Sequence, residues 1–567
     1  MKSLSTVFRI LSILVILFSV FVLGTENSEA NQHQDTTWTT SLIYSNLVVG
    51  VPGEDIASKP SRVDNAGLIH LINGFPTGLG PSGNQTFHQN MTLAEDQAES
   101  EDQFGNTLAS GDFNGDGIYD VAVGVPYENI NLGLSSVISA GAVHVMYGSA
   151  ADVLSFSGDQ FWHQASPGIE GSAEYNDQFG SALAVGNFNG DEYDDLAIGI
   201  PYEDFEYGST IENAGSVIVI YGSSSGLSAA AVLPDQMWHQ DSVSVIDSVE
   251  EYDWFGFSLA AGDFDSDDYD DLAIGVPGED SEAASKDDIG VVQVLYGTTN
   301  GLTADRDQQW EQYDWGGGIE SESYDHFGWS LAVGKFKAHG DDDLAIGVPD
   351  EDIEGFTTVT DAGAVNILYG SNSGLDDAHV DFIYQDGAYV KETAEFQDKF
   401  GYTLAAVDFS GYGIDDLVVG VPNENLGDPV VVDAGAVHVI LHQYALGWVG
   451  DEGRTFHQGK DNIPDELESG DKFGYALAPG DYNGDGKEDL AIGVPYDSCN
   501  DTEDGSVVVI YDDYVFDPDY APQHWCQGNE LIDKGEAGDH FGLALVAIPK
   551  TGTSHFKTYL PVSMRNY

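Results

Sequence analysis

The stretch that decides the fold is residues 104–126, which read FGNTLASGDFNGDGIYDVAVGVP. A Phe-Gly pair opens a short apolar run, an Asp/Asn/Gly-rich turn follows, and a β-branched run ends at Pro126. Residues 142–147 form a third apolar run, and residues 161–164 (Phe-Trp-His-Gln) form a fourth. Short β-branched and aromatic runs separated by Gly, Asp, Asn and Pro are typical of strands. Residues 104–164 therefore predict four short strands and no helix.

Three markers of this unit recur along the chain with the same count. The Phe-Gly pair has its phenylalanine at Phe104, Phe179, Phe255, Phe327, Phe400, Phe473 and Phe541. A Gly-Val/Ile-Pro motif has its proline at Pro52, Pro126, Pro201, Pro277, Pro349, Pro422 and Pro495. An aromatic segment ends in glutamine at Gln89, Gln164, Gln240, Gln312, Gln385, Gln458 and Gln527. Interlocked repeats of four strands predict an all-β, seven-bladed β-propeller of four-stranded antiparallel blades.

The two ends of the repeat region complement one another. The chain starts with strands two to four of a blade, at residues 47–49, 68–71 and 87–89, and ends with a lone first strand at residues 541–548. We therefore expect the C-terminal strand to join the N-terminal blade and close the ring, which leaves no open sheet edge. The predicted organisation is a signal peptide (1–30), a linker (31–40), the propeller (41–548) and a C-terminal tail (549–567).

The N-terminus resembles an export signal. Lys2 and Arg9 precede an apolar run over residues 10–23, and small residues follow up to Ala30. This run is shorter than the roughly 20 residues of a membrane span. We expect a secreted or cell-surface protein whose mature chain has no transmembrane anchor, although a retained anchor is an alternative. Cys499 and Cys526 either pair in an oxidising compartment or remain separate thiols. Asn84, Asn90 and Asn500 begin N-glycosylation motifs that matter only in a eukaryotic host.

The charge balance restricts the possible partners. The formal charge is −78, from 96 acidic and 18 basic residues. Such a field repels phosphate backbones, so nucleic acid is excluded as a partner, and it attracts cations and basic surfaces. Acidity also keeps extracellular proteins soluble, and metal binding accounts for only part of it.

Four of the first turns place oxygen-bearing residues at alternate positions, with a backbone carbonyl at the seventh. Calcium takes six to eight oxygen ligands, so about four Ca²⁺ sites are predicted. Their ligands are Asp112, Asn114, Asp116, Ile118 and Asp120; Asn187, Asn189, Asp191, Tyr193 and Asp195; Asp263, Asp265, Asp267, Tyr269 and Asp271; and Asp481, Asn483, Asp485, Lys487 and Asp489.

Two other interpretations of these turns were weighed. EF-hands are excluded, because the acidic ligand stands at position nine rather than twelve and strands flank the loop. Asp and Asn also form turns without any metal, but four loops in register favour calcium. Residues 335–343, with Lys335, Lys337 and His339 at ligand positions, are expected to hold no tight site. Residues 408–416 are expected to hold at most a weak one.

The order Phe-Gly, acidic loop, Gly-x-Pro resembles the FG-GAP repeat of integrin α subunits and related bacterial proteins, over about residues 40–548. The resemblance implies a seven-bladed adhesion propeller with calcium on its lower face and ligands on its upper face. The chain departs from integrin subunits in having no inserted ligand-binding domain, leg domains, membrane span or cytoplasmic tail. A free-standing secreted bacterial type is the better match.

Strand parity supports the same division of faces. In an antiparallel four-stranded blade, the turns 1–2 and 3–4 share one face, and the connections 2–3 and 4–1 emerge on the other. The predicted partner is an extracellular protein or polysaccharide on the face opposite the calcium loops. An acid that follows each Gly-x-Pro by two residues is expected to bond to its own turn, or else to bind a basic partner or a second layer of cations. These acids are Glu54, Glu128, Glu203, Glu279, Glu351, Glu424 and Asp497.

The leading function is a calcium-binding adhesion or binding module, and no catalytic residues are predicted. The alternatives are an extracellular enzyme of the polysaccharide lyase or lipase kind, and an envelope scaffold. Residues 222–226 fit the G-x-S-x-G pattern of a nucleophile elbow, but their position predicts a turn between strands three and four.

Overall fold

The computed structural model describes residues 44–549, except for 59–60, 150–153, 230–232, 282–284, 313–320, 338–339, 355–357, 428, 444–446, 450–453, 461, 500–501, 513–520, 529–530 and 532–533. The predicted signal peptide, the linker and the tail beyond Pro549 lie outside this range. In the described part, no helix has the length and apolarity needed to cross a membrane.

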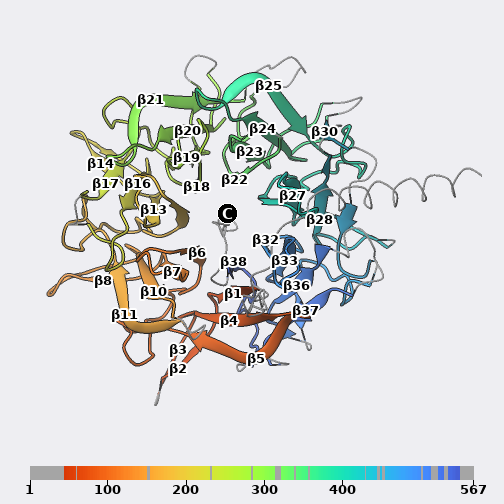
Figure 1. The fold of residues 1–567 in the computed structure, drawn as a ribbon, viewed down its shortest axis with the longest axis horizontal. Helices are drawn as coiled ribbons and strands as arrows, with labels where there is room; N and C mark the ends of the chain where they lie inside the picture. The colour runs from red at the N-terminus through yellow and green to blue at the C-terminus, as the bar shows by residue number, and fades with distance from the viewer. Residues whose placement is uncertain are drawn as a thin grey trace, which may run out of the picture. The chain divides into compact units, whose positions relative to one another are not determined.

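Seven four-stranded antiparallel sheets form the ring that the repeat predicts (Figure 1). Blade 1 contains β38 (Ala544–Pro549), β1 (Ser45–Val51), β4 (Leu68–Phe75) and β5 (Gly78–Phe87). Blade 2 contains β6 (Thr107–Gly111), β7 (Asp120–Val125), β10 (Ala142–Tyr147) and β11 (Ser155–Trp162). Blade 3 contains β12 (Ala182–Gly186), β13 (Asp195–Ile200), β16 (Ser216–Ile220) and β17 (Gln236–Trp238). Blade 4 contains β18 (Ser258–Gly262), β19 (Asp271–Val276), β20 (Val291–Tyr296) and β21 (Thr303–Trp310).

The remaining three blades repeat the pattern. Blade 5 contains β22 (Ser330–Gly334), β23 (Asp343–Val348), β24 (Ala364–Tyr369) and β25 (Asp376–Ile383). Blade 6 contains β26 (Thr403–Val407), β27 (Asp416–Val421), β28 (Ala436–Ile440) and β31 (Arg454–Phe456). Blade 7 contains β32 (Ala476–Gly480), β33 (Asp489–Val494), β36 (Ser506–Ile510) and β37 (Gln523–Trp525).

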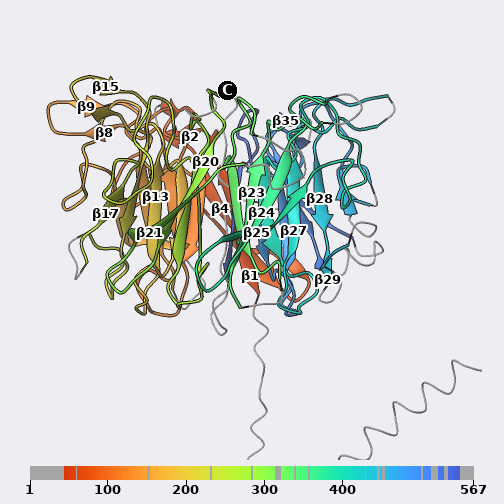
Figure 2. The ribbon, with the colours of Figure 1, turned by 90° about the horizontal axis from the view of Figure 1, so that it is seen from above.

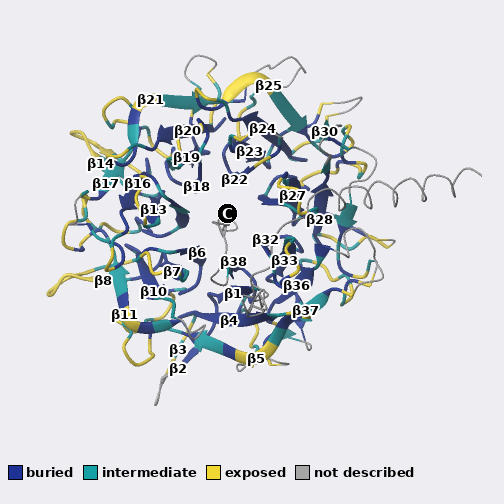
Figure 3. Ribbon diagram, viewed as in Figure 1, coloured by how far each residue is buried: buried dark blue, intermediate teal, exposed yellow. Residues whose placement is uncertain are grey.

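The first strand of each blade lies towards the middle of the ring and the fourth at its rim (Figure 1). The second strands are buried along their whole length, whereas the fourth strands carry the exposed residues (Figure 3). This gradient explains the sequence pattern: β7, β13 and their equivalents read as continuous apolar runs, because both of their faces pack against neighbouring blades.

The ring is closed as the two chain ends predict. Strand β38 pairs antiparallel with β1, with Leu47 opposite Ala547 and Val49 opposite Leu545. The C-terminal strand therefore supplies the innermost strand of a blade whose other three strands come from the N-terminus. The expected first strand at residues 541–548 is confirmed, with its regular part beginning at Ala544.

The hydrophobic core is divided into clusters between adjacent blades. One cluster joins blades 1 and 2 through Val48, Leu108 and Val546, and another joins blades 7 and 1 through Leu47, Val509 and Leu545. Successive residues of β38 thus belong to two different clusters, because successive side chains of a strand point to opposite faces. The packing between blades, rather than within one sheet, holds the ring together.

The Phe-Gly pair anchors each blade to the one before it. Phe104 is fully buried, and its backbone nitrogen donates to the carbonyl of Ala66 in blade 1 at 3.0 Å. Gly105 has a φ of 90°, and a Cβ atom there would lie 2.8 Å from both Ile69 Cγ2 and Leu68 O. Only glycine fits this backbone conformation and this close approach, which is why the pair recurs.

Short hairpins extend the connections between strands two and three, where the sequence suggested only polar loops. They are β2–β3 (Ile56–Ser58, Ser61–Val63), β8–β9 (Ile130–Asn131, Ser136–Val137), β14–β15 (Phe205–Glu206, Thr210–Ile211) and β34–β35 (Ser498–Cys499, Thr502–Glu503). In the side view they project from one end of the ring, here called the upper face (Figure 2). The 3–4 connection of blade 6 carries the hairpin β29–β30 (His442–Gln443, Gly447–Trp448), which lies at the opposite end, the lower face.

Candidate functional site

The acidic 1–2 loops of the lower face share one pattern of internal hydrogen bonds. In blade 2, the carboxylate of Asp112 accepts from the backbone nitrogens of Asp116 at 3.0 Å and Gly117 at 2.8 Å. The equivalent bonds hold Asp263 in blade 4 and Asp481 in blade 7. The first loop residue is thus folded inward over the turn, which is the orientation that an inward-facing ligand set needs.

The ninth loop residue is fixed from two sides. Asp120 is fully buried and accepts from Phe113 N at 3.1 Å and from Gly148 N, at the end of strand three, at 2.9 Å. Asp195, Asp271 and Asp489 make the same pair of bonds in their blades. The second loop residue, an aromatic such as Phe113, is fully buried beneath the turn. The ninth acid therefore also ties the hairpin to strand three.

The loop of blade 4 brings its predicted carboxylate ligands together most closely. Ligand oxygens of Asp263, Asp265 and Asp271 all lie within 4.8 Å of one another. The buried Oδ1 of Asp265 has no hydrogen-bond partner among the described residues. Its Oδ2 pairs with the guanidinium of Arg306, which also lies 4.6 Å from the ring centroid of Tyr296. Hard oxygen donors and one unpartnered buried oxygen fit a calcium ion.

The loops of blades 2, 3 and 7 turn their third and fifth residues towards the same turn. The side-chain oxygens of Asn114, Asn189 and Asn483 each accept from the backbone nitrogen two residues later, at 2.8–3.0 Å. The carboxylates of Asp116, Asp191 and Asp485 do the same, at 2.9–3.0 Å. The backbone carbonyls at position seven, and the metal itself, remain predictions.

Burial and mutual repulsion destabilise the charged carboxylates of these loops when no cation is bound. Burial, with the charges of Asp112 and Asp116 adding to it, raises the pKa of Asp120 to about 8. Burial likewise raises the pKa of Asp271 to about 9 and that of Asp195 well above its ordinary value. A carboxyl with a raised pKa favours its neutral form unless an opposite charge lies close by, and a bound divalent cation supplies that charge.

The two degraded loops differ from one another. The blade 6 loop keeps the internal hydrogen-bond pattern, with Asp408 accepting from Tyr412 N at 3.2 Å and Gly413 N at 2.6 Å, whereas the blade 5 loop carries lysines. In blade 5 the ammonium group of Lys337, at a ligand position, lies 3.0 Å from the ring centroid of Tyr369, and that of Lys335 lies 3.6 Å from Asp342 Oδ1. In blade 6 Ser410 Oγ donates to Asp408 Oδ1 at 2.9 Å. His339 lies outside the described residues. A fixed lysine within a ligand position opposes metal binding by charge.

The upper face gathers the exposed large apolar side chains. Of the 15 such residues in the described part of the chain, 14 lie in the 2–3 and 4–1 connections. They are Met91, Leu93, Leu132, Leu134, Ile138, Tyr175, Tyr207, Val243, Ile246, Tyr252, Tyr324, Phe396, Val430 and Val432. The remaining one is Tyr412, in a lower-face loop. The two faces therefore differ in the number of large apolar side chains that they expose.

The acids that follow Gly-x-Pro bond across the blade junctions. Gln89 Nε2, at the end of blade 1, donates to Glu128 Oε2 of blade 2 at 2.6 Å. The same bond joins Gln164 to Glu203, Gln240 to Glu279, Gln385 to Glu424, Gln458 to Asp497 and Gln527 to Glu54. These acids therefore make a contact between blades, in addition to whatever bond each makes within its own turn.

These inter-blade bonds are structural contacts that the sequence analysis did not predict, although the sequence contains a signal for them. Within the chain the glutamine and its acid are always 39 residues apart, as in Gln164 and Glu203. The last bond, between Gln527 and Glu54, closes the ring across 473 residues. A constant separation between two repeated polar residues indicates a fixed contact between neighbouring repeats.

A second acid, two residues before each Phe-Gly pair, forms a hydrogen bond within its own turn. Asp253 Oδ2 accepts from Glu250 N at 2.7 Å, and Asp398 Oδ2 from Glu395 N at 2.6 Å. In blade 2 the equivalent Asp102 lies close to Glu99 and Glu128, with one oxygen of each within 4.8 Å of the others. Burial, followed by the charge of Glu99, raises the pKa of Asp102 to about 7.

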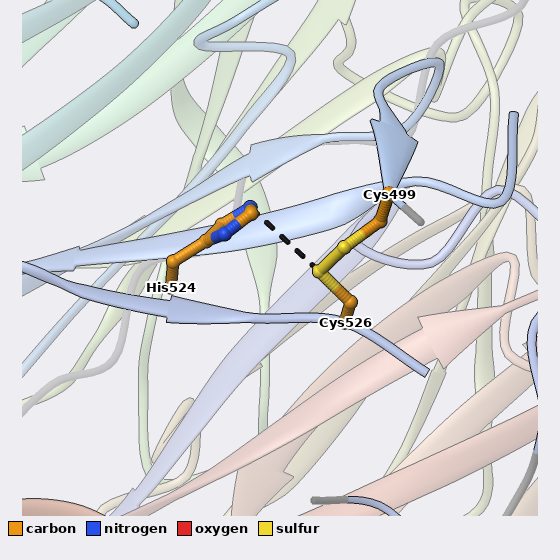
Figure 4. A group of neighbouring side chains, drawn as sticks. All are labelled: Cys499, His524 and Cys526. Atoms are coloured by element: carbon orange, nitrogen blue, oxygen red, sulfur yellow. Dashed lines mark hydrogen bonds between the residues drawn. A yellow bond between two sulfur atoms is a disulfide. The ribbon is translucent and has the colours of Figure 1, made fainter. Parts of the chain in front are cut away.

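The two cysteines form a disulfide, which decides an alternative that the sequence left open. Cys499 in the β34–β35 hairpin is joined to Cys526, directly after β37 (Figure 4). His524 Nε2 lies 3.8 Å from Cys526 Sγ. The bond clamps an upper-face hairpin to the outer strand of blade 7. Disulfides persist in oxidising compartments, which agrees with export from the cytoplasm.

Comparison with known proteins agrees with this architecture. The FG-GAP repeat family matches residues 104–146, 179–220, 255–295, 400–440 and 473–510, which are the first three strands of blades 2, 3, 4, 6 and 7. Integrin alpha-PS2 of Drosophila melanogaster is 30% identical over 231 residues, covering 40% of this chain and 14% of the integrin. Human phosphatidylinositol-glycan-specific phospholipase D is 28% identical over 188 residues, covering 33% of this chain and 21% of the phospholipase.

The chain thus spans about a fifth or less of the length of these curated relatives. Among solved structures, the Dos1 propeller aligns with 92% of this chain and 90% of its own, at 12% identity and a TM-score of 0.37. Five blades carry the family's repeat, and the sheet topology places the same four strands in all seven. The chain is an FG-GAP repeat protein with an integrin α-like propeller.

Proposed function

We propose that this protein is an extracellular binding module, in which calcium stabilises the lower-face hairpins and the upper-face loops bind a protein or polysaccharide. The observation that carries the proposal is the placement of 14 of the 15 exposed large apolar side chains in upper-face connections. Scattered apolar residues would fall on both faces. Large apolar side chains concentrated on one face are typical of interaction surfaces.

The chemistry of these side chains suits recognition. Five are aromatic: Tyr175, Tyr207, Tyr252, Tyr324 and Phe396. Aromatic residues dominate the energetics of protein interfaces, because they bury a large area at a small cost in side-chain entropy. They stand on connections held by a rigid ring, which is the usual arrangement of binding loops on a scaffold.

Calcium has a structural role in this proposal. At about 1 mM Ca²⁺ and a Kd of about 0.1 mM, each site contributes about 1.4 kcal/mol to stability. Four such sites together contribute about 5–6 kcal/mol, which is comparable to the net stability of many domains. The residues that would hold the ions are the side chains at positions one, three, five and nine of the loops in blades 2, 3, 4 and 7. The disulfide supports an extracellular setting, where calcium is abundant.

We favour binding over catalysis. The relatives named above include an integrin and a phospholipase D, and this chain aligns with a small part of each, so neither whole-protein activity transfers. The buried polar groups of the upper face repeat from one junction to the next, as in Gln164–Glu203 and Gln385–Glu424. A repeated contact suits a structural role, whereas catalysis requires a constellation that occurs once.

The test is a glycan and protein array probed with the purified chain in calcium and in EDTA, followed by affinity measurements on any ligand found. The variants Tyr175→Ser and Phe396→Ser should each weaken binding by about fivefold or more, as expected for aromatic contacts worth over about 1 kcal/mol. Tyr412→Ser is the matched control, because it removes an even more exposed aromatic ring from the lower face. Weakening by Tyr412→Ser alone, or turnover of a bound polysaccharide, would contradict the proposal.

A further inference from the structure

The junction between blades 1 and 2 contains a second kind of acidic cluster, on the face opposite the predicted calcium loops. We propose that Gln89, Glu99, Asp102 and Glu128, called the junction cluster from here on, bind a hard divalent cation beneath the upper-face loops. This site is separate from the 1–2 loops in position, in its residues and in its backbone setting.

Three elements position the junction cluster. Gln89 follows β5, the outermost strand of blade 1, Glu99 and Asp102 lie in the turn before β6, and Glu128 lies just after β7. One carboxylate oxygen each of Glu99, Asp102 and Glu128 lies within 4.8 Å of the other two. That spacing allows a single ion to contact all three, since calcium–oxygen distances are about 2.3–2.6 Å.

Two fully buried polar atoms at this place have no partner among the described residues. Asp102 is completely buried, and its Oδ2 accepts from Glu99 N while its Oδ1 accepts nothing. Gln89 is 1% exposed, and its Oε1 also has no hydrogen-bond partner. Its Nε2 donates to Glu128 Oε2 at 2.6 Å, which fixes the amide against the carboxylate of Glu128. Buried polar atoms are rarely left unpaired.

The charge of the junction cluster is also uncompensated. In the described part of the chain, no lysine or arginine forms an ion pair with Glu99, Asp102 or Glu128. Two amides donate to the junction cluster, Gln89 to Glu128 and Asn129 Nδ2 to Glu99 Oε2 at 3.0 Å, and a further acid, Asp96, lies close to Glu128. Three buried or half-buried carboxyls without a counter-charge are costly, and a divalent cation removes most of that cost.

The same unpartnered atoms recur at two other junctions. Gln164 Oε1 and Asp177 Oδ1 are buried without partners beside Glu203, and Gln385 Oε1 and Asp398 Oδ1 are buried without partners beside Glu424. Repetition at equivalent places argues against an accident of one loop. The amide oxygen and the carboxylates are hard donors, so the cation is of the calcium type rather than a soft transition metal.

The experiment counts bound ions by equilibrium dialysis of the full chain with radioactive calcium at neutral pH. The double variant Asp102→Asn with Glu128→Gln should bind one ion fewer than the wild type, since its four 1–2 loops are unchanged. The control Glu170→Gln removes a negative charge from an exposed residue in the equivalent turn of the next blade, and it should bind the full number. Equal counts for all three proteins would overturn the proposal.

A second variant keeps the test decisive if the double variant fails to fold. Gln89→Glu adds a carboxylate to the junction cluster, so a bound cation should increase the difference in melting temperature between calcium and EDTA relative to the wild type. An unchanged or smaller difference would show that no cation is held there. Failure of the four loops to bind calcium would leave this difference in place, so the two ideas are separately testable.

Discussion

Removal of strand β38 is expected to destabilise the whole propeller and not only blade 1. The chain ended after Leu543 loses Leu545, Val546 and Ile548, which are all buried. Burial of one such side chain stabilises a protein by about 1.5–3 kcal/mol, so the three together contribute about 5–9 kcal/mol. Net stabilities are about 5–15 kcal/mol, so the loss is comparable to the whole. Leu545 and Val546 belong to different inter-blade clusters, and both junctions of blade 1 would open.

The assay is thermal unfolding by circular dichroism in excess calcium, with size-exclusion chromatography to detect association through the exposed edge of β1. A chain ended after Pro549 keeps β38 and is the matched control, which should melt like the full chain. A synthetic peptide of residues 538–549 should restore part of the melting temperature of the truncated protein. If the chain ended after Leu543 melts like the full one, the non-covalent closure of the ring is refuted.

Three further predictions follow from the loops, the junctions and the buried acids. EDTA should lower the melting temperature substantially, because four calcium sites contribute about 5–6 kcal/mol to stability at millimolar calcium. An unchanged melting temperature would show that calcium does not stabilise the fold. Gln164→Leu should cost about 1–3 kcal/mol in denaturant unfolding, since Glu203 loses its buried donor, whereas the exposed Gln97→Leu should be neutral. Burial raises the pKa of Asp343 to about 8 and that of Glu351 to about 9, from 3.8 and 4.5. A carboxyl whose pKa is higher in the folded than in the unfolded protein stabilises the fold at low pH, and this stabilisation is lost as the pH rises through the folded pKa. In EDTA the melting temperature should therefore fall between pH 5 and 9, and it should fall less steeply in the variant Glu351→Gln. An equal slope of melting temperature against pH in that variant would contradict the assignment.

The strand order and the ring closure were predictable because short sequence motifs that recur in every blade determine them. Phe104 and its equivalents mark one buried contact per blade. Because three markers recur the same number of times, they indicate seven equivalent blades. The closure followed from counting strands at the two ends, without knowledge of any contact between Val49 and Leu545. Propensity and periodicity are sufficient where each repeat makes the same contacts as the next.

The contacts between blades were harder to predict, because they depend on how far each blade is rotated about the axis. The sequence marks Gln89 as the end of a strand, and Glu128 as an acid that bonds to its own turn or binds a basic partner or a cation, but it does not indicate the bond between them across a junction. The short hairpin at Ile130–Asn131 and Ser136–Val137 has too few residues for a visible strand pattern. The pairing of Cys499 with Cys526 needed the proximity that only the folded blade provides.

The role of the lower-face 1–2 loops as calcium sites is tested most directly by anomalous diffraction from crystals soaked in a lanthanide that replaces calcium. We expect peaks in the 1–2 loops of blades 2, 3, 4 and 7, each surrounded by the side chains at positions one, three, five and nine. A map without peaks in those loops, or with an equally strong peak beside Lys335 and Lys337 in blade 5, would contradict the account.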